Sequence, residues 1–458
     1  MSLIKALMNH TNYGYEDAFG AKDCTSQAMK AAIDDWFDLY LQAAPTEEED
    51  PCQRIPYTVV NKITKTAFSE YKAMSEDEFA QKVLASLERV RQGAMQMALV
   101  GGECLLKPIP TKAKEWRWSV VSRNNVVVFG RNADGDPTDI GSAETKISGR
   151  YRYTLLERRT VDANGYLTIK NRLFRSESEE TLGTPVSLAE LEEYAELAEE
   201  YTYTKPVGTV GLVRVRTPMA NCVDGGTDPV SVYAAAVGLI HNINRNEAQI
   251  NGEFERGESR IITSSDMLKR DKNGNRSFSD HLFVGIDDDI ENVGVTIFSP
   301  TLREQSFLAR KTEYLRNVEN VIGLKRGLLS EVEASERTAK EITSSEGDYN
   351  LTIIDFQNMW ENAAREAVRV CGILGELYKF TGAHEVLDDD LSFDWGNGIL
   401  YDEDKTWDDY KSMVAAGLLK PEIALGWRFG MPTETEADLK AIREKFMPAS
   451  DGAEGDEE

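Results

Sequence analysis

The feature that most constrains this chain is a long apolar periodicity in its last third. From Thr338 to Leu377 apolar residues recur at every third or fourth position, and they include Ile342, Tyr349, Ile353, Phe356 and Trp360. This spacing predicts one α-helix, opened by a capping box of Thr338 and Glu341. About 40 residues at ~1.5 Å rise give a rod on the order of 60 Å long, twice the span of a small domain. We therefore expect its apolar face to pack on copies of the same chain.

Two more helices are predicted before this rod. Asp228-Pro229 favours a helix start, because Asp caps free amide groups and Pro suits the first helical position, and the helix is expected to run to residue 259. Thr301 and Glu304 form a second predicted capping box, which opens a helix over residues 301–324. Strands are expected between the two helices, at 260–264 and 293–298.

The first 227 residues predict a mixture of helices and strands. The expected helices lie at 25–42, 75–97 and 187–201, and the expected strands at 120–130, 151–156 and 207–215. Residues 160–175 centre on Asn164-Gly165, which favours a tight hairpin because both residues tolerate positive φ.

The end of the chain returns to the same alternation. A strand is expected at Leu391–Phe393, then a helix ending at Gly417, then a last helix opened by a capping box of Thr433 and Glu436. Residues 447–458 are acidic and poor in apolar residues, so we expect them to be disordered. The predicted fold class is α+β and predominantly helical.

Charge restricts the function. With 52 Lys plus Arg against 78 Asp plus Glu, the formal net charge is -26. Tight binding of nucleic acid over a whole surface is excluded, because that affinity comes from Lys and Arg displacing phosphate counterions. Weak contact with DNA stays open. The longest apolar run, Ala234–Ile240, is far shorter than the ~20 residues that span a bilayer, and the N-terminus lacks a secretory signal. We expect a soluble intracellular protein with no membrane partner.

Motifs of catalysis are missing from the sequence. It contains no phosphate-binding loop, dinucleotide-binding loop or zinc-protease motif, its four histidines are far apart, and its five cysteines form no CxxC pair. Asp287–Asp289 and Asp388–Asp390 could supply oxygen ligands to a divalent cation, but such triplets are interpreted as solvated loops. We expect no catalytic residue, metal or cofactor. A metal-dependent nucleic-acid-processing enzyme built on these triplets, or a non-catalytic intracellular scaffold, remains the alternative.

One polar connection stands out. Residues 325–337 join two predicted helices and begin with the basic pair Lys325-Arg326 in an acidic chain. The segment is either an ordinary helix–helix connection or a loop that projects into a central space and touches what passes through it.

The order of these elements resembles that of tailed-bacteriophage portal proteins, especially the family from long-tailed phages of Gram-positive bacteria. In that family a Ser/Thr-Ala-x-Glu-Ile-x-Ser pattern opens the long helix, and here it is Thr338-Ala339-Lys340-Glu341-Ile342-Thr343-Ser344. Residues 217–244 are similar to the segment before the first stem helix, 153–178 to the wing hairpin, and 402–425 to the C-terminal helices.

The resemblance implies a ring, usually of twelve subunits, at the unique vertex of the capsid. Double-stranded DNA would be packaged and ejected through its channel with weak contacts, and the protein would be assembled in the host cytoplasm and reside in the virion. The implied partners are the packaging terminase ATPase, the major capsid and scaffolding proteins, and the head–tail adaptor.

The resemblance also implies a division of the chain. The segments are a wing (1–227), stem helices (228–259 and 301–324), a clip (260–300), a tunnel loop (325–337), a long helix (338–377), a return strand to the wing (378–401), crown helices (402–446) and a tail (447–458). The implied channel residues are Lys325, Arg326, Gly327, Leu328, Leu329, Ser330 and Glu331.

Overall fold

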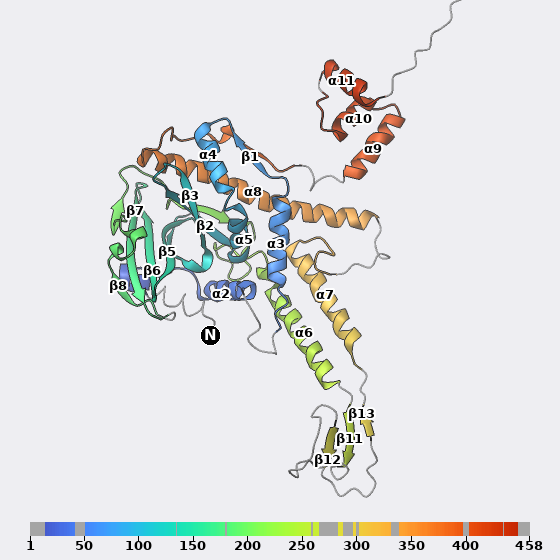
Figure 1. Cartoon of the computed structure of the whole chain (residues 1–458), viewed down its shortest axis with the longest axis horizontal. Coiled ribbons are helices and arrows are strands. Elements are labelled where there is room, and N and C mark those ends of the chain that lie inside the picture. Colours follow the sequence, from blue (N-terminus) through green and yellow to red (C-terminus); the bar gives the residue numbers. More distant parts are fainter. Residues whose placement is uncertain are drawn as a thin grey trace, which may run out of the picture. The chain divides into compact units, whose positions relative to one another are not determined.

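The computed structural model describes residues 14–41, 51–133, 135–178, 181–257, 260–264, 283–286, 296–298, 302–330, 339–396, 403–433 and 435–447. They belong to two compact units, Met1–Phe393 and Asp394–Glu458. Helices and strands are mixed in the first unit (Figure 1), which confirms the predicted α+β class. No helix among the described residues combines the length and the apolar character that crossing a membrane requires.

In its described residues the first part of this unit contains a short helical segment at 14–19, followed by α2 Gln27–Leu41, α3 Ile55–Ala67, α4 Glu78–Leu87 and α5 Arg91–Gly101. The helix expected at 25–42 is confirmed as α2, whereas α3 was not expected. The prediction of a single helix at 75–97 is wrong, because the helix is interrupted by a turn between Leu87 and Arg91. Buried Leu87 and Ala94 are seven residues apart, the spacing of an unbroken helix, so periodicity does not reveal the break.

Two antiparallel sheets lie beside these helices (Figure 1). The smaller sheet has the order β10-β2-β3, from Val213–Arg216, Glu103–Pro110 and Trp116–Ser122. The larger has the order β4-β5-β6-β7-β8, with β9 also paired to β7. Its strands are β4 Val126–Arg131, β5 Pro137–Ser148, β6 Tyr151–Val161, β7 Leu167–Ser176, β8 Thr184–Val186 and β9 Glu200–Thr202. Buried apolar side chains of β2, β4 and β5 form one shared core cluster.

The hairpin predicted around Asn164-Gly165 is confirmed. Strands β6 and β7 pair up to Val161 and Leu167. The Asp162 side chain accepts hydrogen bonds from the backbone amides of Asn164 and Tyr166, and Gly165 has φ 84°. Glycine occupies this left-handed region without the steric cost that a Cβ brings.

The acidic helix expected at 187–201 is wrong. Two short 3₁₀ turns, Leu188–Glu190 and Glu192–Tyr194, stand there, followed by β9. Leu188, Leu191 and Tyr194 pack in one cluster on the sheet, and their spacing of three is that of a 3₁₀ helix rather than an α-helix.

Asp228 does not cap a helix, contrary to the sequence expectation. Its carboxylate pairs with Arg131 and Arg123 inside the first unit. Val230, Val232 and Tyr233 after it are buried in the core, and the Tyr233 hydroxyl donates to the Trp36 carbonyl at 2.8 Å. Helix α6, Val237–Arg256, therefore begins only after a 3₁₀ turn at Ala234–Ala236.

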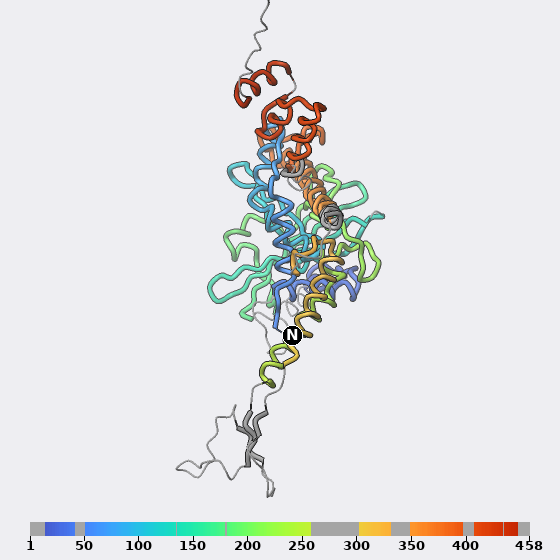
Figure 2. Tube along the Cα trace, turned by 90° about the vertical axis from the view of Figure 1, so that its right-hand side faces the viewer, coloured from blue at the N-terminus to red at the C-terminus, as the bar shows by residue number. Residues whose placement is uncertain are grey.

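Helices α6 and α7 Glu304–Ile322 pack side by side (Figures 1 and 2). Helix α7 begins after Arg303, whose side chain provides no cap. Thr301 of the capping box expected with Glu304 lies outside the described residues. Three short strands occupy the chain between the helices: β11 Arg260–Ser264, β12 Phe283–Ile286 and β13 Thr296–Phe298. The two predicted strands are confirmed, and β12 pairs in parallel with β11 as a third.

The long helix predicted at 338–377 is confirmed as α8, Ala339–Leu377. It packs against α3, α4 and β10 (Figure 1). The strand expected at Leu391–Phe393 is also confirmed, as β14 Leu391–Asp394, which pairs with β1 Lys72–Ser75.

The second unit contains α9 Glu403–Ala415, α10 Pro421–Arg428 and α11 Glu436–Phe446. The last capping box is formed by Thr435 and Asp438, not by Thr433 and Glu436. Arg443 of α11 donates to the Glu422 carboxylate of α10 at 2.7 Å. Residues 448–458 lie outside the described residues.

Candidate functional site

The α6–α7 helix pair is held by polar contacts. Arg303 binds the Glu253 carboxylate through two nitrogens, at 3.0 and 2.7 Å. The Lys311 ammonium lies 2.6 Å from the Glu247 carboxylate, and the buried Asn246 amide donates to the Phe307 carbonyl at 3.1 Å. These contacts fix how the two helices face each other.

Few residues of α7 are buried by the described part of the chain. Its buried residues are Val318, Glu319 and Ile322, all in the last turns, and no residue from Glu304 to Asn317 is buried by the described part of the chain. Leu308 is 45% exposed, and Phe254 of α6 is 46% exposed. Most of α7 therefore has α6 as its support within the described chain.

The chain after α7 folds back on the helix end. Gly323 has φ 79°, and the Leu324 amide donates to the Glu319 carbonyl at 2.8 Å. The buried Glu319 side chain accepts hydrogen bonds from the amides of Gly327, Leu329 and Ser330 and from the Ser330 hydroxyl. One carboxylate thus organises the whole turn, and we call residues 323–330 the Glu319 turn.

Two neighbouring helices fix the position of the Glu319 turn. The Lys62 ammonium of α3 donates to the Leu328 carbonyl at 2.6 Å. A Cβ at Gly323 would lie 2.7 Å from the Thr352 hydroxyl of α8. The turn therefore lies where α3, α7 and α8 meet.

The seven residues predicted for a channel loop fall mostly within this turn. Arg326 and Gly327 are exposed, Lys325, Leu328 and Leu329 are half-buried, and Ser330 is buried; Glu331 lies outside the described residues. The structure brings the first six together. It also shows that Gly327, Leu329 and Ser330 are hydrogen-bonded to Glu319, a residue that sequence reasoning missed. The sequence feature that could have revealed Glu319 is its position four residues after Leu315, which places a carboxylate on the apolar stripe of α7.

The stripe of α8 packs within its own chain, which corrects the expectation that its partner is another copy. Tyr349, Ile353, Phe356 and Trp360 are all buried; the side chain of Ile342 lies outside the described part. The Trp360 indole donates to the Tyr71 hydroxyl at 3.1 Å and packs edge-on against Phe68. Because α3 and α4 cover the stripe, the helix does not need a second subunit to bury it.

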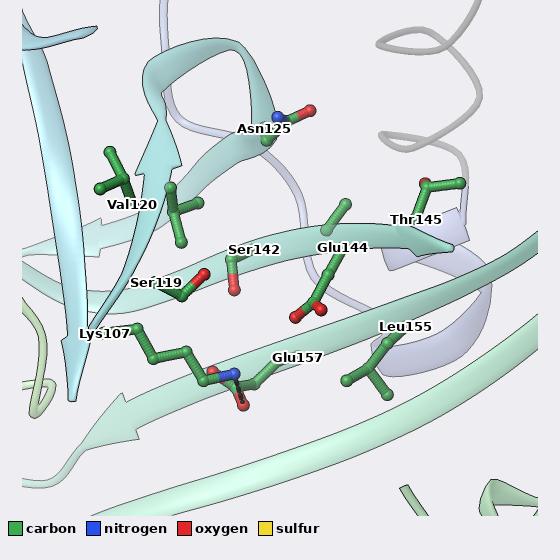
Figure 3. A pocket seen from close by; sticks show the side chains of 11 residues that line it. Lys107, Ser119, Val120, Asn125, Ser142, Glu144, Thr145, Leu155 and Glu157 are labelled. Atoms are coloured by element: carbon green, nitrogen blue, oxygen red, sulfur yellow. Dashed lines mark hydrogen bonds and ion pairs between the residues drawn. The ribbon is translucent and has the colours of Figure 1, made fainter. Parts of the chain in front are cut away.

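A partly open polar cavity lies between the two sheets (Figure 3). Its volume is about 170 Å³, room for roughly ten water molecules. Figure 3 shows the Lys107 ammonium against the Glu157 carboxylate, with Ser119, Ser142 and Glu144 around the same space. Lys107 and Arg159 each contact Glu157 at 2.7 Å. Burial raises the pKa of Glu157, but the two cations outweigh it and lower the pKa to about 2. The Lys107–Glu157 pair joins β2 of the small sheet to β6 of the large one, and Arg159 supports Glu157 from the same strand.

A second buried ionic cluster joins the small sheet to the chain before α6. Arg123, 2% exposed, pairs with Glu103 and Asp228, and Arg214 pairs with Glu103 at 3.0 Å. Burial raises the pKa of Glu103, yet the Arg214 and Arg123 guanidinium groups leave it below its ordinary value. Each charge in the cluster has an opposite charge beside it, as buried ions require.

Metal-ligand chemistry finds little support in the described part of the chain. No group of three or more His, Cys, Asp or Glu side chains there could hold a metal ion. Asp388–Asp390 forms an exposed 3₁₀ turn, and Asp287–Asp289 lies outside the described residues.

The family comparison agrees with this arrangement. Residues 72–445 match the family model described as phage portal protein, SPP1 Gp6-like. The chain belongs to the phage portal protein family. The resemblance seen in the sequence is thereby confirmed, and a portal protein is a structural, head–tail connecting component of a bacteriophage particle rather than a catalyst.

A solved structure gives a weaker likeness. A chain from the neck of a native GTA particle computed with C12 symmetry is 12% identical, with 92% of this chain and 99% of that chain covered and a TM-score of 0.44. No curated protein matches this portal chain.

Proposed function

We propose that this portal chain assembles with identical copies into a closed ring of twelve subunits, and that the ring conducts double-stranded DNA into and out of the capsid. The observation that supports it most is the exposed course of α7, where no residue from Glu304 to Asn317 is buried by the described chain. Isolated helices of this length are marginal in water, since packing supplies most helical stability. Neighbouring subunits around a cyclic axis would supply the packing.

The charge of the chain supports a conduit rather than a DNA clamp. The net charge of -26 repels a polyanion, and each phosphate contact adds close to one unit to the salt slope of affinity. A strongly basic bore would hold DNA still. An acidic bore with a few cations at one constriction lets it slide, and Lys325 and Arg326 in the Glu319 turn are our candidates for that constriction.

We assign the remaining segments by the same proposal. Residues 1–227 with the strand within 378–401 form the wing, and 228–259 with 301–324 form the stem. Residues 260–300 form the clip, which docks the terminase ATPase during packaging and the head–tail adaptor later. Residues 325–337 form the tunnel loop, and 402–446 form the crown. ATP hydrolysis belongs to the terminase, and the portal assembles in the host cytoplasm with capsid and scaffolding proteins before residing in the virion.

Sedimentation of three proteins tests the assembly. We compare the full chain with L308E/L315E in α7 and with I147E, a control that adds a Glu at a 71% exposed apolar residue of strand β5. The wild type and I147E should sediment as rings, and L308E/L315E as single subunits with unchanged circular dichroism. A ring of unchanged mass for L308E/L315E would contradict the use of α7 as an interface.

A further inference from the structure

A groove in the first unit combines aromatic and basic side chains in its lining. It lies between α4 and the β2–β3 hairpin and has a volume of about 730 Å³, within the ordinary range for ligand sites. Its floor is aromatic, and its lining includes Phe79, Trp116, Trp118 and Phe380. α4 and β3 lie side by side (Figure 1). Each of these four aromatic side chains is only 7–9% exposed, so a small part of each ring faces the open groove.

The rim of the groove is basic, although the chain as a whole has a negative net charge. Four cations line it, Lys82, Arg89, Lys114 and Arg117, with one carboxylate, Glu115. Arg89 and Arg117 are exposed and form no ion pair or hydrogen bond with any described residue. In a chain with 26 more acidic than basic side chains, this rim is a local reversal of charge.

One buried polar atom in the groove lacks a partner. Trp116 is 7% exposed, and its indole Nε1 is buried without a hydrogen-bond partner in the described chain. The neighbouring Trp118 differs, since its Nε1 donates to the Ser86 hydroxyl at 2.7 Å. Leaving a buried donor unpaired costs about 1–3 kcal/mol. That cost lies within the wall of the groove, because the atom has no exposed surface while the groove is empty.

The walls of the groove are already fixed in place. Trp116 lies against Phe380, with ring centroids 4.7 Å apart. The Lys114 ammonium donates to the Tyr378 carbonyl at 2.8 Å and lies 5.3 Å from the centre of the Phe380 ring. These contacts tie the hairpin to the chain after α8, so an occupant meets a preformed surface, which reduces the ordering that binding requires.

We propose that this groove binds an acidic peptide segment of a partner protein. An apolar side chain of the peptide packs against the Trp116–Phe380 wall, and carboxylates of the peptide pair with Arg89 and Arg117. The narrow aromatic floor favours a peptide over duplex DNA, whose phosphates need a long basic face. The inference stands on the groove alone and is independent of the conduit proposal.

Fluorescence anisotropy tests it with the full chain. The probe is a fluorescein-labelled dodecapeptide of Glu and Asp with one central Phe. It should bind the wild type saturably, and R89E/R117E should weaken binding about tenfold or more, as loss of close charge pairs does. The matched control is K22E/K205E, which reverses two exposed lysines outside the groove and should bind within about twofold of wild type.

A second variant separates binding from folding. R89K/R117K keeps both positive charges at exposed positions, so it should bind the peptide within about threefold of wild type with an unchanged melting temperature. No saturable binding to the wild type, or equal affinity for wild type and R89E/R117E, would overturn the proposal. So would a DNA duplex that competes with the peptide, or a change in subunit number in R89E/R117E, which would make the groove a nucleic-acid site or a subunit interface.

Discussion

The Glu319 carboxylate holds Ser330 at two points, accepting the Ser330 backbone amide at 2.9 Å and the Ser330 hydroxyl at 2.8 Å. Glu319 is wholly buried and lies in the last turns of α7, eleven residues before Ser330. The chain is thus fixed at the point where it leaves the Glu319 turn. In the proposed ring this contact anchors the tunnel loop, residues 325–337, to the end of α7.

Removing that carboxylate should loosen the turn. E319A leaves the amides of Gly327, Leu329 and Ser330 without their acceptor, and we expect the free energy of unfolding to fall by about 3 kcal/mol in denaturant titration. E313A removes an exposed carboxylate of the same helix and should change it by less than about 0.5 kcal/mol. Equal stability of the two variants would show that the hydrogen bonds to Glu319 do not organise the turn.

Reversing the charge of the basic pair should impair packaging. K325E/R326E removes the only weak DNA contacts that we assign to the Glu319 turn, while the contacts of Glu319 stay in place. Ring assembly should be normal by sedimentation, and the DNA packaged in a reconstituted assay should fall clearly below wild type. K22E/K205E changes the net charge equally outside the turn and should package normally. Normal packaging by K325E/R326E would remove the DNA-contact role.

The sequence predicted those elements whose signals are local. Asn164-Gly165 indicated the hairpin, although only Gly165 takes a positive φ there, and the long periodicity indicated α8. It missed α3, whose Val59, Val60 and Ile63 are β-branched although they have helical spacing. In this case burial against α5 and α8 outweighs propensity.

The prediction failed where one residue pattern is compatible with two different structural roles. Asp228-Pro229 reads as a helix start, but the Asp228 carboxylate instead neutralises Arg131 and Arg123, which are distant in sequence. The Glu319 turn shows the same limit. Lys325 and Arg326 are visible as charges in the sequence, whereas the role of Glu319 depends on a turn that forms only in the folded chain.

Acid should weaken the first unit of the chain through Glu157. Its pKa in the folded chain is about 2, below the ordinary 4.5, so its ion pairs contribute fully above about pH 4.5 and are lost as the pH falls toward 2. The free energy of unfolding should fall between about pH 5 and pH 2 by roughly 3 kcal/mol more in wild type than in E157Q. E196Q changes an exposed carboxylate and should follow wild type. Parallel pH curves for wild type and E157Q would contradict the assignment.

The packing of α8 predicts that truncating one apolar residue lowers the free energy of unfolding strongly and that truncating another hardly changes it. Phe356 is fully buried by its own chain, whereas Leu351 is 63% exposed. F356A should lower the free energy of unfolding by about 3–5 kcal/mol, because it leaves a cavity in the core. L351A should change it by less than about 0.5 kcal/mol. Similar losses for both in denaturant titration would mean that both faces of α8 are covered within the subunit.

The central claim is that identical subunits close into a ring around a channel. Electron microscopy of the purified full chain at micromolar concentration tests it most directly. We expect closed rings of uniform subunit number with an axial hole wide enough for a DNA duplex. Single subunits at that concentration, or open filaments without a hole, would contradict the account.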